Sequence, residues 1–368
     1  MTAIHRDLFG PGPTNVPQRI LDALSAPTIG HLDPEFLAIM DQTSAHLRYA
    51  FATSNPLTFV LSAPGSIGME TSLVNLLEPG DKIIICINGV FGGRMKEIAR
   101  RCGAQVVTVE NAWGTPVDLD QVEAALTENP DAGVLAFVHA ETSTGVRSDA
   151  ASLAALAQKY NCLSVADCVT SLSGVELRVD DWGLDVVYSG SQKCLSCVPG
   201  LSPISFSSRA VERIKGRQAP AQSWFCDISL LMSYYEAGEK TRAYHHTAPV
   251  NSLYAIREAL RLVEEETLEA RWARHQGAAQ HLYQRLSEAG LEMLVAAEHR
   301  LAPLTLVKVP DGIDDAVVRG NLLRNRNIEL GGGLGQFAGK AWRIGLMGAN
   351  ATAERADFLV DALLEEMK

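Results

Sequence analysis

Hydrophobic and polar positions follow two patterns in the first 260 residues of the chain. Short apolar runs, which predict buried strands, occupy residues 82–86, 134–138, 163–166, 186–188 and 204–206. Between them, residues 69–77 and 150–160 carry apolar side chains three and four positions apart, as helices do. Strands that alternate with helices form a mostly parallel sheet covered on both faces, so we expect an α/β fold.

The pattern changes at about residue 267. We expect a long amphipathic helix at residues 270–289 and a strand at 304–309. Two short segments at 316–323 and 342–346 and a closing helix at 353–367 follow. This order is typical of a smaller α+β domain. We therefore predict an N-terminal arm over residues 1–18, a large domain over 19–265 and a small C-terminal domain over 266–368.

Composition and charge narrow the class of protein. The 368 residues are 47% hydrophobic with a formal net charge of -11, which supports a large core and argues against nucleic acid as a partner. No apolar run approaches the roughly 20 residues that a membrane crossing needs, and the first residues do not resemble a signal peptide. We expect a cytoplasmic protein with no membrane partner.

The seven cysteines are an odd number and lie mostly in apolar stretches, which favours reduced thiols. Cys194 and Cys197 have the C-x-x-C spacing of half a redox or metal site. A zinc site needs two more ligands, and the neighbours His245 and His246 point in different directions along an extended backbone. We expect two packing cysteines and no metal.

Polar residues follow the predicted strands where a parallel sheet binds ligands, beyond the carboxyl ends of the strands. Asp167 ends one apolar run, and a buried carboxylate needs a cationic partner such as the ring nitrogen of pyridoxal phosphate. A helix cap or a structural ion pair is the alternative. Lys193 follows the next strand and residues 189–192 (SGSQ), which can approach a phosphate. A desolvated lysine there forms imines and moves protons, whereas the alternative is a solvated surface lysine.

Other segments offer groups that a phosphate-bearing cofactor and its substrate would use. Gly65 and Ser66 lie in a turn before a helix, which is either a phosphate cup or plain capping with Ser66 as the N-cap. Phe91 could stack on a cofactor ring or belong to the core. Arg343 interrupts an apolar strand, where it either binds a substrate carboxylate or faces water at an edge. Residues 244–247 (YHHT) offer hydroxyls to a phosphate or form a structural loop.

Taken together, these segments resemble the alanine-glyoxylate and serine-glyoxylate aminotransferase family of the class V aminotransferases. The resemblance spans nearly the whole chain and rests on residues 10–13 (GPGP), 65, 141–145 (ETSTG), 167–169 (DCV), 189–193 (SGSQK), 244–247 (YHHT) and 342–345 (WRIG). Each segment alone is weak evidence, whereas the combination is specific.

The resemblance implies an enzyme of fold type I that depends on pyridoxal 5'-phosphate, with a mostly parallel sheet of the seven-stranded type. It implies that Lys193 carries this cofactor as a Schiff base and that Asp167 contacts the pyridine nitrogen. It also implies that Gly65, Ser66 and Gln192 hold the phosphate. The family forms homodimers with active sites at the interface, so we expect a homodimer here.

The remaining roles follow in the same way from the resemblance. Phe91 and Val169 would pack on opposite faces of the cofactor ring, and Thr142 would form a hydrogen bond near the ring oxygen. Tyr244 and Thr247 would reach the phosphate bound in the partner subunit. In animal members of the family, tryptophan stands at the position of Phe91.

We expect transamination from a small L-amino acid, alanine or serine, to a 2-oxo acid, glyoxylate. Arg343 would bind the α-carboxylate, and the lack of an evident second arginine favours donors without a distal acid group. Other class V specificities, with ureidoglycine, aspartate or a pyridoxamine-type amine as donor, stay open. A lyase such as a cysteine desulfurase or kynureninase is disfavoured because Cys194 adjoins the lysine. A binding protein without activity is disfavoured because Lys193, Asp167 and Arg343 are all present.

Overall fold

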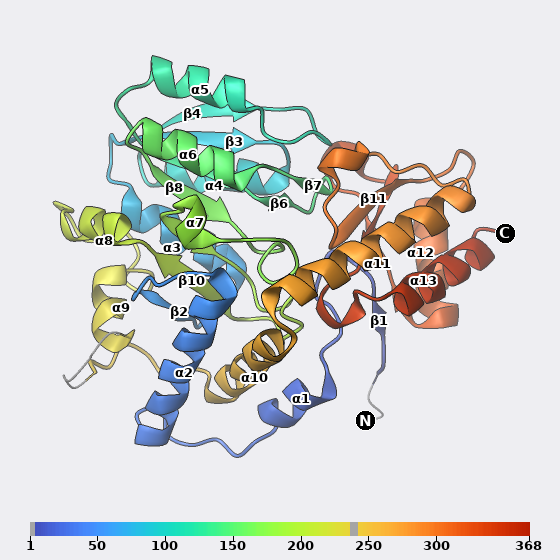
Figure 1. The fold of residues 1–368 in the computed structure, drawn as a ribbon, viewed down its shortest axis with the longest axis horizontal. Helices are drawn as coiled ribbons and strands as arrows, with labels where there is room; N and C mark the ends of the chain where they lie inside the picture. Colours follow the sequence, from blue (N-terminus) through green and yellow to red (C-terminus); the bar gives the residue numbers. More distant parts are fainter. Residues whose placement is uncertain (1–3, 236–241) are drawn as a thin grey trace.

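The computed structural model describes residues 4–235 and 242–368 and places a seven-stranded sheet beside a three-stranded one (Figure 1). The large sheet has the strand order β2-β10-β9-β8-β5-β3-β4, and β10 alone in it runs antiparallel to its neighbours. The expected mostly parallel sheet is therefore confirmed. Its strands are β2 (Thr58–Leu61), β3 (Lys82–Ile87), β4 (Gln105–Glu110), β5 (Ala132–Val138), β8 (Leu163–Asp167), β9 (Val186–Tyr188) and β10 (Ser202–Phe206).

Both faces of this sheet are covered, because alternate residues of each strand enter two different cores. In β3, Ile83 and Ile85 join one core while Ile84 and Cys86 join the other. This double burial explains why the strands read as continuous apolar runs. One face carries α3 (Gly65–Leu76), α4 (Val90–Arg101), α8 (Ser208–Lys215) and α9 (Ile228–Tyr235). The other carries α1 (Gln18–Leu24), α2 (Pro34–Phe51), α5 (Leu119–Glu128), α6 (Ala150–Lys159), α7 (Val179–Trp182) and α10 (Val250–Glu266).

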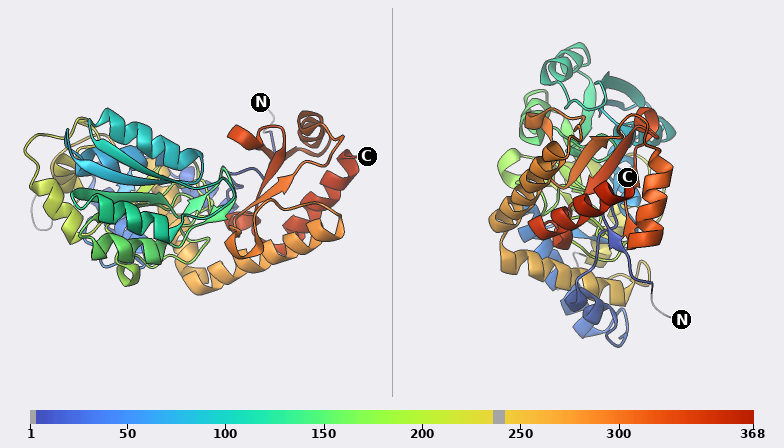
Figure 2. Two further views of the ribbon diagram at one scale, coloured as in Figure 1. Left: turned by 90° about the horizontal axis from the view of Figure 1, so that it is seen from above. Right: turned by 90° about the vertical axis from the view of Figure 1, so that its right-hand side faces the viewer.

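The C-terminal part has its own sheet and its own apolar core (Figure 2). The antiparallel sheet orders β11 (Leu304–Lys308), β14 (Ala341–Gly345) and β13 (Gly331–Gly332). Around it lie α11 (Leu268–Glu288), α12 (Asp315–Arg326) and α13 (Ala353–Glu366). The N-terminal β1 (Asp7–Leu8) pairs with β12 (Ile328–Glu329), so the arm is attached to this part. The hairpin β6 (Ala140–Glu141) and β7 (Val146–Arg147) completes the strands.

Three details differ from the sequence expectations or lie beyond them. The strands β2 and β4 were not predicted: β2 is only 4 residues long, and β4 is an edge strand whose residues are mostly part-exposed. Helix α3 begins at Gly65 with Pro64 as its N-cap, so the alternative in which Ser66 is the N-cap is wrong. The proposed domain boundary at residue 265 falls one residue before α10 ends and stays a prediction.

Candidate active site

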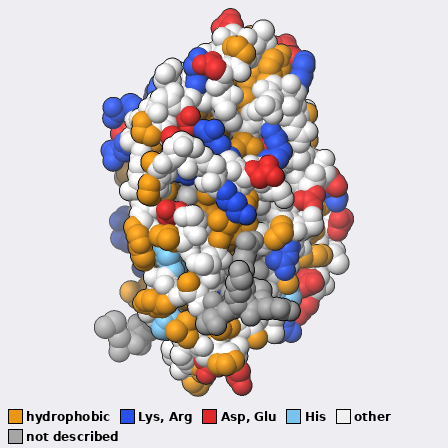
Figure 3. All heavy atoms as spheres, turned by 90° about the vertical axis from the view of Figure 1, so that its left-hand side faces the viewer, with side chains coloured by type: hydrophobic (Ala, Val, Ile, Leu, Met, Phe, Trp, Pro, Cys, Tyr) orange, Lys and Arg blue, Asp and Glu red, His pale blue; other side chains and the backbone are white. Residues whose placement is uncertain are grey.

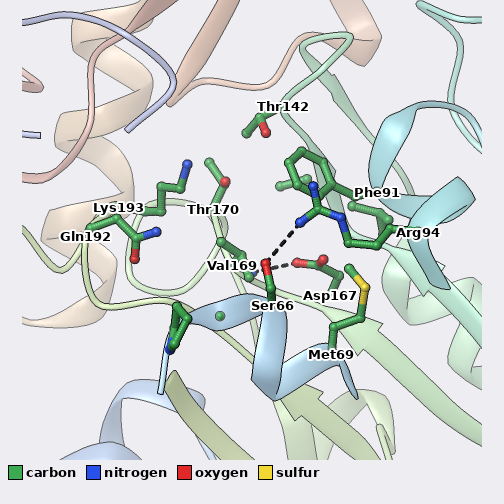
Figure 4. A pocket seen from close by; sticks show the side chains of 14 residues that line it. Ser66, Met69, Phe91, Arg94, Thr142, Asp167, Val169, Thr170, Gln192 and Lys193 are labelled. Atoms are coloured by element: carbon green, nitrogen blue, oxygen red, sulfur yellow. Dashed lines mark hydrogen bonds between the residues drawn. The ribbon is translucent and has the colours of Figure 1, made fainter. Parts of the chain in front are cut away.

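One cavity, of about 290 Å³, collects most of the predicted cofactor residues beyond the carboxyl ends of the parallel strands (Figure 4). The predicted residues that line it are Gly65, Ser66, Phe91, Thr142, Asp167, Val169, Gln192 and Lys193. They come from the start of α3, the start of α4, the loop after β6, the end of β8 and the loop after β9. Segments that are far apart in the sequence therefore converge on one site.

Asp167 is a buried carboxylate at the end of β8 and is only 3% exposed. Its two oxygens accept hydrogen bonds from the backbone N–H of Val169 at 2.9 Å and from the hydroxyl of Tyr188 at 2.8 Å. Burial raises the pKa of this carboxyl to about 6, and the two hydrogen bonds and the charges of Lys193 and Arg94 oppose that shift. A carboxylate in such a place favours a cationic ligand beside it.

Lys193 lies in the same cavity and is 9% exposed. Its Nζ donates a hydrogen bond to the carbonyl oxygen of Pro11. Burial lowers the pKa of Lys193 to about 8, and the positive charge of Arg343 acts in the same direction. The neutral amine that condenses with a carbonyl is thus available near neutral pH. Gly12 has φ +103° and a Cβ there would lie 2.5 Å from the lysine Cδ, so the arm must present glycine to this side chain.

The start of α3 and Gln192 form the part of the cavity suited to a phosphate. No side chain caps α3, so the first backbone N–H groups, those of Gly65 and Ser66, stay available to an anion at the positive end of the helix dipole. The buried Oε1 of Gln192 has no hydrogen-bond partner among the described residues. A Cβ on Gly65 would lie 3.2 Å from Val169 and 3.3 Å from the carbonyl oxygen of Ser189, so larger residues would narrow this space.

Phe91 lies in the first turn of α4 and is held there by a buried glutamate. The backbone N–H of Phe91 donates to Glu141 at 3.1 Å, and that of Val90 donates to the Ser143 hydroxyl at 3.0 Å. The same hydroxyl donates to Glu141 at 2.6 Å, which closes the network. A Cβ on Gly89 would lie 2.4 Å from Glu141, so glycine is required at this turn. These contacts fix Phe91 opposite Val169 in the cavity (Figure 4).

Three of the predicted site residues do not line this cavity. Arg343, on β14, is 8% exposed; its Nε donates to the carbonyl oxygen of Gly332 at 2.7 Å. Its Nη1 donates to the carbonyl oxygen of Thr142 at 3.5 Å, which places the guanidinium beside the cavity that Thr142 lines. Tyr244 is 62% exposed, and its hydroxyl lies 3.3 Å from that of Thr247, which is also exposed. Within one chain, this pair contributes nothing to the cavity.

Sequence reasoning missed several residues of this site, of which Arg94 and Tyr188 bear most on its charge. Arg94 lines the cavity from α4, one helical turn after Phe91, and that i, i+3 spacing is the signal that could have found it. It is a second arginine at this site besides Arg343, which the expectation of a donor without a distal acid group did not take into account. Tyr188 bonds Asp167 because β8 and β9 pair those two residues directly, a register that the sequence does not show.

The two cysteines beside the lysine are structural. Cys194 and Cys197 are buried, and burial raises the pKa of each thiol to about 12. The Sγ of Cys194 donates to the carbonyl oxygen of Thr170 at 3.1 Å. Neither is a thiolate near neutral pH, which a persulfide carrier would have to be. Among residues 4–235 and 242–368, no group of three His, Cys, Asp or Glu side chains is arranged to hold a metal.

The fold and this cavity define a class V aminotransferase. The family model described as aminotransferase class-V matches residues 7–353, and the chain belongs to that family. It is 42% identical to the alanine-glyoxylate aminotransferase of Rattus norvegicus over 99% of this chain and 88% of the relative. It is 34% identical to the (S)-ureidoglycine-glyoxylate transaminase of Bacillus subtilis over 97% of this chain and 89% of that relative.

A solved structure gives the same assignment. The alanine-glyoxylate aminotransferase of Nostoc sp. superposes with a TM-score of 0.97 at 44% identity, covering 100% of this chain and 97% of that one. The expected family and fold are therefore confirmed. In the described part of the chain, no helix is both long and apolar enough to cross a membrane.

Proposed function

We propose that this aminotransferase uses pyridoxal phosphate to transfer the amino group of L-alanine or L-serine to glyoxylate. The observation that carries the proposal is the pairing, in one cavity, of a buried lysine with a depressed pKa and a buried carboxylate without a cationic partner. The named activity of the Rattus norvegicus and Nostoc sp. relatives supports the substrates.

The residues present fit this cofactor. Lys193 would hold it covalently through Nζ, and Asp167 would face its ring nitrogen. The first N–H groups of α3 and the side-chain amide N–H of Gln192 would donate to its phosphate. Phe91 and Val169 would enclose its ring. When bound, pyridoxal phosphate supplies an electron sink and a carrier for the amino group.

The protein side chains then have separate tasks. Lys193, whose pKa burial lowers to about 8, moves the proton at the substrate Cα. Asp167 keeps a positive charge opposite its carboxylate, since an isolated buried anion is costly. Arg343 binds the α-carboxylate with its remaining guanidinium donors. Holding the carboxylate in this way orients the substrate Cα toward Lys193.

A homodimer belongs to the same proposal. Tyr244 and Thr247 are exposed beside each other, and Trp224, at 63% exposed, stacks on His245 with ring centroids 4.5 Å apart. Hydrophobic and histidine side chains gather along one side of the molecule in Figure 3. An exposed aromatic group of this kind suits a protein interface, where Tyr244 and Thr247 would reach the partner's phosphate.

Absorption spectroscopy and product analysis test the proposal. The protein with bound cofactor should show a visible band that fades with L-alanine and returns with glyoxylate, while pyruvate and glycine form in equal amounts. Lys193→Ala should lack the band and the turnover, whereas Arg101→Gln, on the exposed side of α4, should behave as wild type. If L-alanine leaves the band unchanged but (S)-ureidoglycine or L-aspartate removes it, that compound and not L-alanine is the amino donor. Absence of any band after addition of pyridoxal phosphate would refute the proposal.

A further inference from the structure

Arg94 is the arginine of the cavity that has no assigned task. It lies on α4 and is exposed toward the cavity, with its Nη1 donating to the Ser66 hydroxyl at 3.0 Å (Figure 4). Its guanidinium carbon stands 5.0 Å from the centroid of the Phe91 ring. Two side chains that we assign to the cofactor therefore hold this one cation.

The other cations of α4 are engaged with carboxylates. Arg100 and Arg101 pair with Glu97 at 3.1 and 2.9 Å, and Lys96 lies 3.4 Å from Glu110. No ion pair within residues 4–235 and 242–368 includes Arg94. A cation that a fold turns toward a cavity without an acidic partner is suited to bind an anion there.

We propose that Arg94 binds the phosphate of the cofactor, an inference that rests on the proposed function. A phosphate monoester carries a charge of about -1.5 to -2 at neutral pH, whereas a helix N-terminus supplies only about +0.5. Gln192 adds no charge. Asp167 and the ring nitrogen neutralise each other, and Lys193 would be bonded to the cofactor, so Arg94 is the cavity cation left to balance the phosphate.

The place of Arg94 favours the phosphate over a substrate carboxylate. Its hydrogen bond to Ser66 ties it to the first turn of α3, whose backbone N–H groups form the anion cup. Arg343, by contrast, extends from β14, and its Nη1 donates to the carbonyl oxygen of Thr142 at 3.5 Å, so it lies on the side of the cavity that Thr142 lines. With Arg94 committed to the phosphate, a single arginine remains for substrate, which agrees with donors that lack a distal acid group.

Binding to the cofactor-free protein tests this assignment with two ligands that differ only by the phosphate. Dissociation constants for pyridoxal phosphate and for pyridoxal are measured by fluorescence titration for wild type, Arg94→Gln, Arg94→Lys and the control Arg101→Gln. Loss of a charge-assisted bond should weaken pyridoxal phosphate about tenfold or more in Arg94→Gln while pyridoxal changes less than about twofold. Arg94→Lys should be intermediate. Inorganic phosphate should compete about tenfold less well in Arg94→Gln.

Each contrary result has a distinct meaning. Equal weakening of both ligands would show that Arg94 only supports Phe91, and the assignment would fail. Unchanged binding of pyridoxal phosphate with a raised KM for L-aspartate would make Arg94 a carboxylate site instead, and the assignment would also fail. If wild type bound neither ligand, the proposed function itself would fall. Arg94 is exposed, so its variants should stay folded, and thermal melts check this.

Discussion

Buried ionisable groups occur in two regions of this molecule with opposite surroundings. In the cavity, Asp167 and Lys193 have no ion-pair partner among the described residues and carry pKa values shifted toward neutrality. Where α11 packs against the loop that follows the lysine, Arg271 pairs with Glu266 at 2.7 Å and donates to the carbonyl oxygen of Cys194 at 2.7 Å. His275 also satisfies both ring nitrogens, with Arg271 and Gly348.

The ionisable groups around Arg271 stabilise the fold, whereas those in the cavity are placed to bind a ligand. Burying a charge costs free energy unless a partner compensates it. The charge of Arg271 has a carboxylate partner within the chain, although its Nε has no hydrogen-bond partner among the described residues, so this region stabilises the protein without a ligand. The cavity lacks them, so part of its stability must come with the cofactor, because a ligand that binds only the folded state stabilises it.

The largest effect on the free energy of unfolding should come from a substitution in the region around Arg271. Arg271→Met should lower the free energy of unfolding by about 2–3 kcal/mol, because it leaves the buried Cys194 carbonyl without its donor and removes one of the two arginines that pair with Glu266. Urea denaturation measures it. The matched control Arg101→Met removes an exposed pair with Glu97 and should cost less than about 1 kcal/mol. Equal losses for the two variants would contradict the distinction between the regions.

A smaller change in stability, of opposite sign, is expected for a substitution in the cavity. Asp167→Asn should raise the stability of the cofactor-free protein at pH 7.5 by about 1–2 kcal/mol, because it removes a buried carboxylate whose pKa burial raises to about 6. The free-energy penalty of that carboxylate is fully present above pH 6, and it decreases as the pH falls toward the lower pKa that the carboxyl has in the unfolded chain. Urea denaturation at pH 7.5 and pH 5 checks both points. With pyridoxal phosphate added, the wild type should gain more stability than the variant.

How far the sequence predicts this site depends on which contacts create it. Asp167 and Lys193 were predictable because strands buried on both faces read as continuous apolar runs, and the residue after such a run lies at the ligand edge. The edge strand β4 was not predicted, because only one of its residues is buried and it therefore lacks the continuous apolar run of a central strand. Its register and the bond from Tyr188 to Asp167 arise from pairing between distant segments. Periodicity within one segment carries no information about such pairing.

The residues outside the cavity show a second limit. Arg343 belongs to a different sheet, so its distance from Lys193 depends on how the two parts of the chain pack. Tyr244 and Thr247 are exposed in one chain, and their predicted role requires a partner subunit. Arg94 was within reach of sequence reasoning, since it follows Phe91 by one helical turn, but single arginines on amphipathic helices are usually solvated.

The smallest effect is a pH dependence that belongs to Lys193. Because its folded pKa of about 8 lies below the unfolded value of 10.5, the unfolded chain binds more protons between these pH values, and stability rises with pH. From pH 8 to pH 9 the cofactor-free wild type should gain about 1 kcal/mol relative to Lys193→Met, which lacks this proton. The difference between the two proteins cancels the titration of all other groups. A flat difference over this range would mean that the lysine is solvated like a surface residue, and the contrast between the two regions would rest on Asp167 alone.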